Sequence, residues 1–477
     1  MQSAKLPIAL LESLQGVTGF DREAFVQVHE SGAQVTSVRL NPAKPVNSEW
    51  SIVNNIPDDK EVGIHHSPLT IDPIPWSSQG YYLSQRPFFT FDPLFHAGVY
   101  YVQEASSMFV EQALKQTTDL SQPLRVLDLC AAPGGKSTLL QSLISENSLL
   151  VSNEVIKSRA GILDENLTKW GAINTIVTNN DPKDLAQLHH FFDVIVVDAP
   201  CSGSGLFRRD PDAIQEWSEQ NVQLCHQRQQ RILADIYPAL KPGGVLIYST
   251  CSYSKEEDEE ITDWLINEQE ATSLPLTIDA SWGIVETRSE EQGAYGYRFF
   301  PDKVKGEGFF IACFRKADDD AQARKLPKRS KLQKLSKAED AIVRPWLKAD
   351  APVQLWKQGE LIIAFPQVLE QELLQIADIA YIRKAGVLMG KIAGKDLVPD
   401  HALAVSTIVN GGIVAISLKK EDALQYLRRE EVMIASPQKG WALIQYQQIN
   451  LGWVKLLGNR VNNYYPSNWR ILKSANN

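Results

Sequence analysis

Short runs rich in Val, Ile and Leu alternate with amphipathic stretches through the middle of this 477-residue chain, and this alternation sets the fold class. The apolar runs cover residues 125–129, 149–153, 174–178, 193–198 and 244–249. Helical spacing is found between them, at 136–143, 157–170 and 212–240. Such runs are typical of buried parallel strands. Strands that alternate with helices predict an α/β protein with a doubly wound sheet, in which ligands bind beyond the carboxyl ends of the strands.

The length predicts about three domains. We expect a small α+β domain at 1–93, the α/β domain at 94–316, a basic linker at 317–338 and a C-terminal region at 339–477. The fractions of hydrophobic (44%) and charged (22%) residues indicate a soluble globular chain. The sequence contains no apolar run of the length that a membrane span needs, and its start lacks the features of a secretory signal. These observations predict a cytoplasmic protein without a membrane partner.

Charge is distributed unevenly along the chain. From Arg324 onward there are 23 Lys and Arg against 13 Asp and Glu, a net charge of +10, whereas the whole chain has −9. Seven of the basic residues lie in the run RKLPKRSKLQKLSK, which contains no acid. A basic C-terminal third favours contact with a polyanion such as RNA, and a chance imbalance is the alternative.

The last 46 residues, from Val432, contain no acid and interleave basic with aromatic side chains. The basic residues are Lys439, Lys455, Arg460, Arg470 and Lys473, and the aromatic residues are Trp441, Tyr446, Trp453, Tyr464, Tyr465 and Trp469. This pattern suits RNA, because unpaired bases stack on aromatic rings while phosphates pair with cations. The alternative is a small β-barrel with an aromatic core, and we expect about half of these rings to be buried in either case.

The segment RVLDLCAAPGGKSTLL predicts a strand, a glycine-rich turn and a helix. Its GGKST end is similar to a nucleoside-triphosphate loop, but Cys130 occupies a position where that loop needs glycine. What remains is a turn whose backbone NH groups can approach a ligand. Acids follow three later strands: Glu154, placed to accept hydrogen bonds from ribose hydroxyls, Asp181 and Asp198. Each acid alone is more often a turn or helix cap.

Two of the five cysteines also follow strands: Cys201 in DAPCSGSG and Cys251 in STCSYSKEE. This placement predicts two thiols over one crevice. Ser254 and Glu257 have the spacing of a capping box, which predicts a helix start that favours the thiolate form of Cys251. The other three, Cys130, Cys225 and Cys313, are expected to pack in the interior. The cysteines show no CxxC or HxxxH spacing, so no metal site is predicted.

The motifs DLCAAPGGKS, DAPCSGSG and STCS, in this order, resemble the signature of the RNA (cytosine-5) methyltransferases. The resemblance extends from about residue 35 to 316 and includes Arg39 and Asn41 in SVRLNP, residues 103–106, and GFFIACFRK. It implies a class I fold that binds S-adenosylmethionine. The C-terminal segments GVLMGKIAGKDLVPDHALA and RVNNYYP are similar to those of family members that act on small-subunit ribosomal RNA, which have a PUA-like RNA-binding domain.

The resemblance also implies residue roles. Cys251 would be the nucleophile that adds to carbon 6 of cytosine, Cys201 would assist product release, and Asp198 would protonate or hydrogen-bond ring N3, which stabilises the adduct. Glu154 would bind the cofactor ribose, Asp181 the adenine, and Asp198 would lie near the methionine end. The cofactor turn would consist of Cys130, Ala131, Ala132, Pro133, Gly134, Gly135 and Lys136.

The resemblance predicts methylation of ribosomal RNA, within the small subunit, without an obligate protein partner. A tRNA (cytosine-5) methyltransferase is the near alternative. A ribosome-assembly factor that binds RNA without turnover is the alternative from another class, because a fold alone does not fix an activity.

Overall fold

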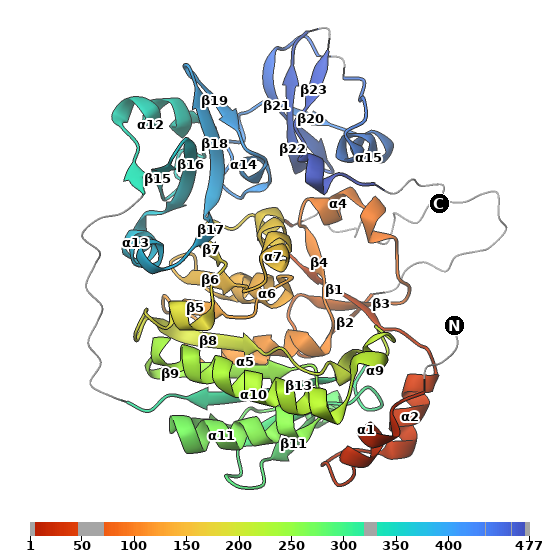
Figure 1. The fold of residues 1–477 in the computed structure, drawn as a ribbon. Coiled ribbons are helices and arrows are strands. Elements are labelled where there is room, and N and C mark those ends of the chain that lie inside the picture. Colours follow the sequence, from red (N-terminus) through yellow and green to blue (C-terminus); the bar gives the residue numbers. More distant parts are fainter. Residues whose placement is uncertain (1–4, 46–70, 319–331, 435, 459, 473–477) are drawn as a thin grey trace, which may run out of the picture.

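The computed structural model describes residues 5–45, 71–318, 332–434, 436–458 and 460–472. A ten-stranded sheet forms the centre of this part of the chain, and three smaller sheets surround it (Figure 1). The predicted basic linker at 317–338 falls largely on residues 319–331, which lie outside the described residues. None of the described helices is long and apolar enough to cross a membrane.

The predicted doubly wound α/β sheet is confirmed. Its parallel strands have the order β9-β8-β5-β6-β7. Their bounds are β5 (Arg125–Asp128), β6 (Leu149–Asn153), β7 (Thr175–Thr178), β8 (Phe192–Asp198) and β9 (Leu240–Thr250). The chain runs from β5 outward to β7 and then returns past β5 to β8. The topological switch point therefore lies between β5 and β8, where open α/β sheets bind ligands.

Antiparallel strands extend this sheet at both edges. At one edge the order continues from β9 through β13 (Phe309–Arg315) and β12 (Tyr295–Phe299) to β11 (Val285–Arg288), and β10 (Thr272–Leu274) also pairs with β13. At the other edge β17 (Ile382–Ala385), from the C-terminal region, pairs with β7. The ten-stranded sheet is therefore completed by residues far beyond 316.

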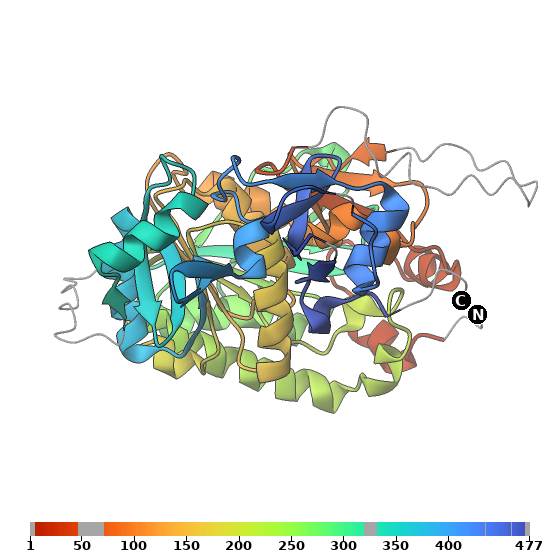
Figure 2. The same ribbon diagram turned by 90° about the horizontal axis from the view of Figure 1, so that it is seen from above.

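Helices cover both faces of the sheet because the side chains of each buried strand alternate between the two faces (Figures 1 and 2). Val126 and Val194 pack with α5 (Val110–Thr117) and α6 (Gly135–Leu143) on one face. Leu127 and Ile195 face α10 (Glu219–Ile236) and α11 (Glu259–Gln269) on the other. The remaining helices around the sheet are α7 (Lys157–Trp170), α8 (Pro182–Leu185) and α9 (Ala213–Glu216).

Among the described residues, the N-terminal part consists of three α-helices and a four-stranded antiparallel sheet of order β2-β3-β1-β4. Its elements are α1 (Ile8–Ser13), α2 (Arg22–Glu30), β1 (Thr36–Leu40), β2 (Ile71–Pro73), β3 (Gly80–Leu83), α4 (Pro93–His96) and β4 (Tyr100–Val102). Asp21 begins α2 by accepting hydrogen bonds from the backbone NH groups of Glu23 and Ala24. The strand β4 leads directly into the wall of the candidate site.

The C-terminal region contains two further sheets. The first has the order β14-β15-β16-β18-β19 and the second β20-β21-β22-β23. The first comprises β14 (Gln333–Lys334), β15 (Val353–Gln358), β16 (Leu361–Pro366), β18 (Val387–Ala393) and β19 (Asp396–Pro399), with α12 (Lys337–Val343), α13 (Glu370–Ile379) and α14 (His401–Val405). The second comprises β20 (Ala415–Ser417), β21 (Gly440–Tyr446), β22 (Ile449–Leu456) and β23 (Val461–Asn463), with α15 (Lys420–Arg428).

Half of the six C-terminal aromatic rings are buried, as the sequence pattern led us to expect. Tyr446, Trp453 and Tyr465 belong to the core. Trp441 and Trp469 are half-buried and Tyr464 is exposed. The last sheet packs against the N-terminal part, since Val38 and Leu94 share a core cluster with residues such as Tyr426 and Val454. The N-terminal part and the last sheet therefore share one hydrophobic core.

Candidate active site

A pocket of about 510 Å³ opens beyond the carboxyl ends of β5, β8 and β9. We call it the reaction pocket. Its wall includes residues 101–104, at the end of β4 and just beyond it, and residues 307–309, which lead into β13. The predicted site residues that line it are Cys130, Ala131, Ala132, Pro133, Gly135, Lys136, Asp198, Cys201 and Cys251. Residues that are far apart in sequence thus meet at the switch point of the sheet.

The glycine-rich turn between β5 and α6 leaves its backbone open toward the pocket. Gly134 has a φ of +114°, a conformation that side chains with a Cβ rarely adopt. A Cβ at Gly135 would lie 3.3 Å from Cε1 of Tyr101, so a larger residue would crowd the opposite wall. The helix α6 begins at Gly135, and the NH groups of its first turn therefore lie beside the pocket.

The N-terminal sheet supports this turn through Arg39. The guanidinium of Arg39 donates hydrogen bonds to Gln103 Oε1 (2.8 Å), Gly135 O (3.3 Å) and Thr138 Oγ1 (2.5 Å). It also lies 4.8 Å from the ring of Trp170. Burial lowers the pKa of Arg39 to about 9. The arginine of the SVRLNP motif therefore holds the first turn of α6 against the N-terminal sheet.

The two predicted thiols meet in the reaction pocket. Both cysteines are free, and Cys201 Sγ lies 2.9 Å from Cys251 Sγ. A hydrogen bond to Cys251, together with burial, raises the pKa of Cys201 well above its ordinary value. Cys201 therefore remains a thiol that can donate its hydrogen to the sulfur of Cys251. A main-chain hydrogen bond also joins the loop after β8, which contains Cys201, to Cys251 after β9, because Gly205 N donates to Cys251 O at 2.8 Å.

A cation and a hydroxyl group orient Asp198 at the end of β8. Lys136 Nζ lies 2.8 Å from Oδ2 of Asp198, and Ser249 Oγ donates to Oδ1 at 2.8 Å. Burial disfavours the charge on Lys136, but the Asp198 carboxylate outweighs this effect and the pKa of Lys136 is raised. Asp198 thus presents a fixed carboxylate beside the two thiols.

Glu154 and Asp181 lie at strand ends, as predicted, but outside the lining of the reaction pocket. Glu154 Oε1 accepts from Ile156 N at 2.8 Å, and Oε2 lies 3.5 Å from Nη1 of Arg159. Asp181 caps α8 by accepting from Lys183 N at 3.2 Å. Gly134 also lies outside the lining, behind its neighbour Gly135. The cofactor contacts of Glu154 and Asp181 stay predictions.

Several lining residues were missed by sequence reasoning. They are Tyr101, Arg159, Arg209, Glu307 and Phe309. Glu307 is buried, which raises its pKa to about 7, and Arg208 Nη1 lies 3.6 Å from its Oε2. These residues come from four separate segments, namely β4, α7, the loop that contains Arg209 and the start of β13, so no single local spacing could have brought them together.

The expected capping box at Ser254 and Glu257 is wrong. Ser254 precedes a short 3-10 helix (Lys255–Glu257) without a side-chain cap, and α11 begins only at Glu259. The carboxylate of Glu257 instead accepts hydrogen bonds from Ser202 and Ser252. A helix dipole acts within its first turn, so α11 does not supply the predicted preference for a thiolate at Cys251.

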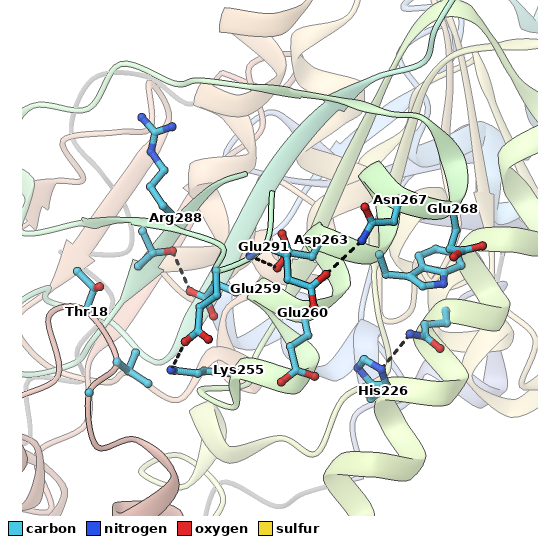
Figure 3. A pocket seen from close by; sticks show the side chains of 16 residues that line it. Thr18, His226, Lys255, Glu259, Glu260, Asp263, Asn267, Glu268, Arg288 and Glu291 are labelled. Atoms are coloured by element: carbon cyan, nitrogen blue, oxygen red, sulfur yellow. Dashed lines mark hydrogen bonds and ion pairs between the residues drawn. The ribbon is translucent and has the colours of Figure 1, made fainter. Parts of the chain in front are cut away.

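A larger hollow of about 600 Å³ lies elsewhere, between α10, α11 and β11 (Figure 3). We call it the acidic hollow. It has no lining residue in common with the reaction pocket. Figure 3 shows the carboxylates of α11 gathered there, and the acids in its lining are Glu259, Glu260, Asp263, Glu268, Glu290 and Glu291. Among the described residues, no group of three or more His, Cys, Asp or Glu side chains is placed to hold a metal ion.

Comparison with known families assigns three parts of the chain. Residues 6–105 match the N-terminal domain of 16S rRNA methyltransferase RsmF, and residues 115–315 match 16S rRNA methyltransferase RsmB/F. Residues 414–471 match the methyltransferase RsmF PUA domain. Ribosomal RNA small subunit methyltransferase F of Cronobacter sakazakii is 30% identical over 417 residues, which cover 83% of this chain and 84% of that protein. The chain belongs to this methyltransferase F family.

Other known proteins agree with this family assignment. The methyltransferase F of Klebsiella pneumoniae is 31% identical over 417 residues, with the same coverage of both chains. The crystal structure of NSun6 from Pyrococcus horikoshii with SFG superposes with a TM-score of 0.53 and 19% identity, over 66% of this chain and all of that one. PH0851 gives a TM-score of 0.55 and 24% identity, over 65% of this chain and 66% of that one. These two structures support the fold.

The cofactor of the family is S-adenosylmethionine, and the reaction pocket fits it. The glycine-rich turn offers bare backbone, and a Cβ at Gly135 would make a tight contact of 3.3 Å with Tyr101. The pocket volume is in the range of small-molecule sites. The pocket also extends from this turn to both thiols, so one cavity can hold a cofactor and a reacting base together.

Proposed function

We propose that this chain methylates carbon 5 of a cytosine in small-subunit ribosomal RNA through a covalent bond between Cys251 and carbon 6. The observation that carries the proposal is the pair of free thiols, 2.9 Å apart, beside Asp198 in the pocket of the glycine-rich turn. The named activity of the relatives supports ribosomal RNA of the small subunit as the substrate.

The two thiols can supply the activation that carbon 5 of cytosine needs before it accepts a methyl group. Its carbon 5 is a poor nucleophile until a thiolate adds to carbon 6, which makes carbon 5 enamine-like. S-adenosylmethionine, when bound, supplies an electrophilic methyl group. After methyl transfer a base or water in the pocket must take the proton from carbon 5. The electron pair of that C–H bond restores the double bond between carbons 5 and 6, and the sulfur of Cys251 leaves carbon 6 with the electron pair of the C–S bond. The thiol of Cys201 can donate a hydrogen bond to the departing sulfur of Cys251, which assists release.

Asp198 and the residues around it position the reactants. We assign Asp198 to ring N3 of the cytosine, where it protonates the nitrogen or accepts a hydrogen bond from its protonated form, which stabilises the adduct. Lys136, 2.8 Å from Oδ2, balances the charge of Asp198. For the cofactor we assign the turn at 130–136, Glu154 to the ribose, Asp181 to the adenine and Asp198 to the methionine end. The target base must leave its stack to reach the thiols.

Substitution of each thiol tests the proposal. Purified Cys201→Ala protein, incubated with RNA and cofactor, should accumulate an RNA adduct that survives denaturation, because addition proceeds while release is impaired. Cys251→Ala should form no adduct and should lose methyl transfer by at least roughly 10⁴-fold. The readout is a shifted band in a denaturing gel, with tritiated methyl transfer measured in parallel.

The outcomes separate the alternatives. A Cys225→Ala control removes a thiol on α10 outside the pocket and should behave like the wild type. The opposite pattern of adducts would exchange the roles of Cys201 and Cys251. Equal turnover without Cys251 would contradict the mechanism. Transfer of methyl groups to tRNA but not to ribosomal RNA or subunits would contradict the substrate, and binding without any turnover would favour an assembly factor.

A further inference from the structure

We propose that Glu257 is a positioning residue that holds the two cysteine loops together and thereby sets the distance between the thiols. Its importance for turnover rests on the proposed function, but its geometric role does not. Glu257 lies outside the lining of the reaction pocket and therefore acts through its neighbours. It is fully buried, with 0% of its surface exposed.

The contacts of Glu257 connect two separate loops. Cys201 follows β8 and Cys251 follows β9, and a serine comes directly after each cysteine. Glu257 Oε1 accepts from Ser202 N at 2.7 Å, and Oε2 accepts from Ser202 Oγ (2.5 Å) and Ser252 Oγ (2.6 Å). One carboxylate therefore binds the residue after each thiol.

Further contacts fix Glu257 itself. Gln229 Nε2, on α10, donates to Glu257 Oε1 at 3.3 Å and to Pro200 O at 3.1 Å. The hydroxyl group of Tyr248, on β9, donates to the main-chain oxygen of Glu257 at 2.6 Å. The carboxylate is thus held between the sheet and α10. A buried carboxylate costs free energy unless its oxygens are satisfied, and here the satisfying donors include both loops.

Two substitutions separate the hydrogen bonds of Glu257 from its charge. In Glu257→Gln, the amide oxygen can replace Oε1, and the two serine hydroxyl groups can rotate to accept from the amide nitrogen. In Glu257→Ala, the NH group of Ser202 and both hydroxyl groups lose their acceptor. Both variants lack the negative charge, so a difference between them reports on the side chain that links the loops and not on its charge.

Oxidation of the two thiols measures their spacing without RNA. Diamide takes up two electrons and two protons as Cys201 and Cys251 lose their thiol hydrogens and form one S–S bond, and diamide becomes the hydrazine. We would follow this cross-link by alkylation and peptide mapping of the full chain. We expect Glu257→Gln to react within about threefold of the wild type, and Glu257→Ala to react roughly tenfold or more slowly than Glu257→Gln.

Matched controls keep the test decisive. Glu256→Ala removes the neighbouring carboxylate, which forms no side-chain hydrogen bond with a described residue, and should match the wild type. If Glu257→Ala fails to fold, Ser252→Ala leaves the bonds from Glu257 to Ser202 in place and removes the Ser252 hydroxyl group, which also accepts from Ser254 N at 3.0 Å. It should still slow the cross-link by about threefold. Cofactor binding by isothermal titration should be unchanged in every folded variant.

The outcomes distinguish this proposal from the proposed function. A wild-type rate of cross-linking in folded Glu257→Ala or in Ser252→Ala would overturn the positioning role, whatever the enzyme methylates. Conversely, the cross-linking result can hold even if no RNA is methylated. In turnover, we expect Glu257→Ala to lower kcat by roughly 100-fold with little change in KM for RNA, and Glu257→Gln to restore most of kcat.

Discussion

Asp128, at the end of β5, holds a proton more tightly than an ordinary aspartate. Its side chain is fully buried, and burial raises its pKa to about 7, although a hydrogen bond from Ser137 opposes this effect. Ser137 Oγ donates to Oδ2 at 2.7 Å, while Oδ1 has no hydrogen-bond partner among the described residues. The nearby carboxylates of Asp198 and Glu154 act in the same direction as burial. The site therefore concentrates negative charge that the fold must accommodate.

This burial predicts a pH dependence of stability. The unfolded chain releases the Asp128 proton near pH 4, whereas the folded chain keeps it to about pH 7. Protonated Asp128 therefore makes its full contribution to the free energy of unfolding below pH 4. This contribution, up to about 4 kcal/mol, is lost as the pH rises through 7. Asp128→Asn should reduce the fall in Tm between pH 5 and 8, measured by differential scanning fluorimetry. Asp279→Asn, at an exposed position, should leave the slope unchanged, and an equally steep fall in Asp128→Asn would contradict the assignment.

At the scale of elements, the catalytic sheet depends on segments beyond the methyltransferase match at 115–315. The strand β17 pairs with β7, and Gly386 N donates to Thr175 O at 2.9 Å. The helix α13 adds Leu373 and Ile376, both 0% exposed, to the core cluster that contains Leu127 and Ile195. The β17–α13 segment is therefore part of the catalytic core rather than a separate appendage.

A substitution in α13 tests this integration. Leu373→Ala removes a fully buried side chain and should lower the free energy of unfolding by about 2–5 kcal/mol. Urea unfolding, followed by fluorescence and circular dichroism, should show one transition that moves as a whole. Val368→Ala, at a neighbouring position that is 64% exposed, should change it by less than about 0.5 kcal/mol. Two separate transitions, with only one shifted, would indicate that the segment folds independently.

The elements that the sequence predicted well share one property, which is strong local periodicity. The apolar runs at 149–153 and 193–198 became β6 and β8 with bounds that agree within a residue. The strand β17, in contrast, has the sequence IRKA. Its two basic residues give no strand pattern, so the sequence did not predict that it pairs with β7 at the edge of the sheet. A strand that is stabilised by pairing at an edge leaves little signal in its own composition.

The same distinction applies to the site. Cys201, Cys251 and Asp198 could be placed together because parallel strands end at one edge of the sheet. The role of Glu257 could not be predicted, because its spacing from Ser254 suggested a local helix cap. Its hydrogen-bond partners are instead Ser252 and, on another loop, Ser202. Tyr101 and Arg159 reach the pocket from β4 and α7, so only the assembled fold shows them.

At the scale of the whole molecule, charges of opposite sign gather on different surfaces. The acidic hollow lies beside α11 and β11 (Figure 3). At the last sheet, exposed Lys439 directly precedes β21, half-buried Lys455 lies on β22 and exposed Arg460 directly precedes β23. Lys455 Nζ lies 5.3 Å from the ring of Trp441, which contacts Tyr464 at 4.5 Å between ring centroids. None of the three cations forms an ion pair with a described residue. This basic aromatic surface is suited to the RNA that we propose as substrate.

The salt dependence of RNA binding tests this surface. Cations that pair with phosphates release counterions, so the logarithm of the binding constant falls with the logarithm of salt concentration, by about 0.7–0.9 per contact. A triple variant, Lys439→Gln, Lys455→Gln and Arg460→Gln, should reduce this slope by about 2 for a small-subunit RNA fragment. Trp441→Ala should instead weaken binding by roughly 5- to 100-fold at every salt concentration without changing the slope, since stacking releases few ions. Fluorescence anisotropy between about 50 and 300 mM salt measures both the binding constant and its slope against salt concentration.

A control in the acidic hollow makes the test specific to the surface. Lys255→Gln and Arg288→Gln remove cations that pair with Glu290 and Glu286. Because the acids around them repel phosphates, these substitutions should leave the slope unchanged. Equal slopes for the wild type and the triple variant would show that RNA approaches by another face. Reduced slopes in both sets would mean that net charge, rather than the last sheet, governs binding.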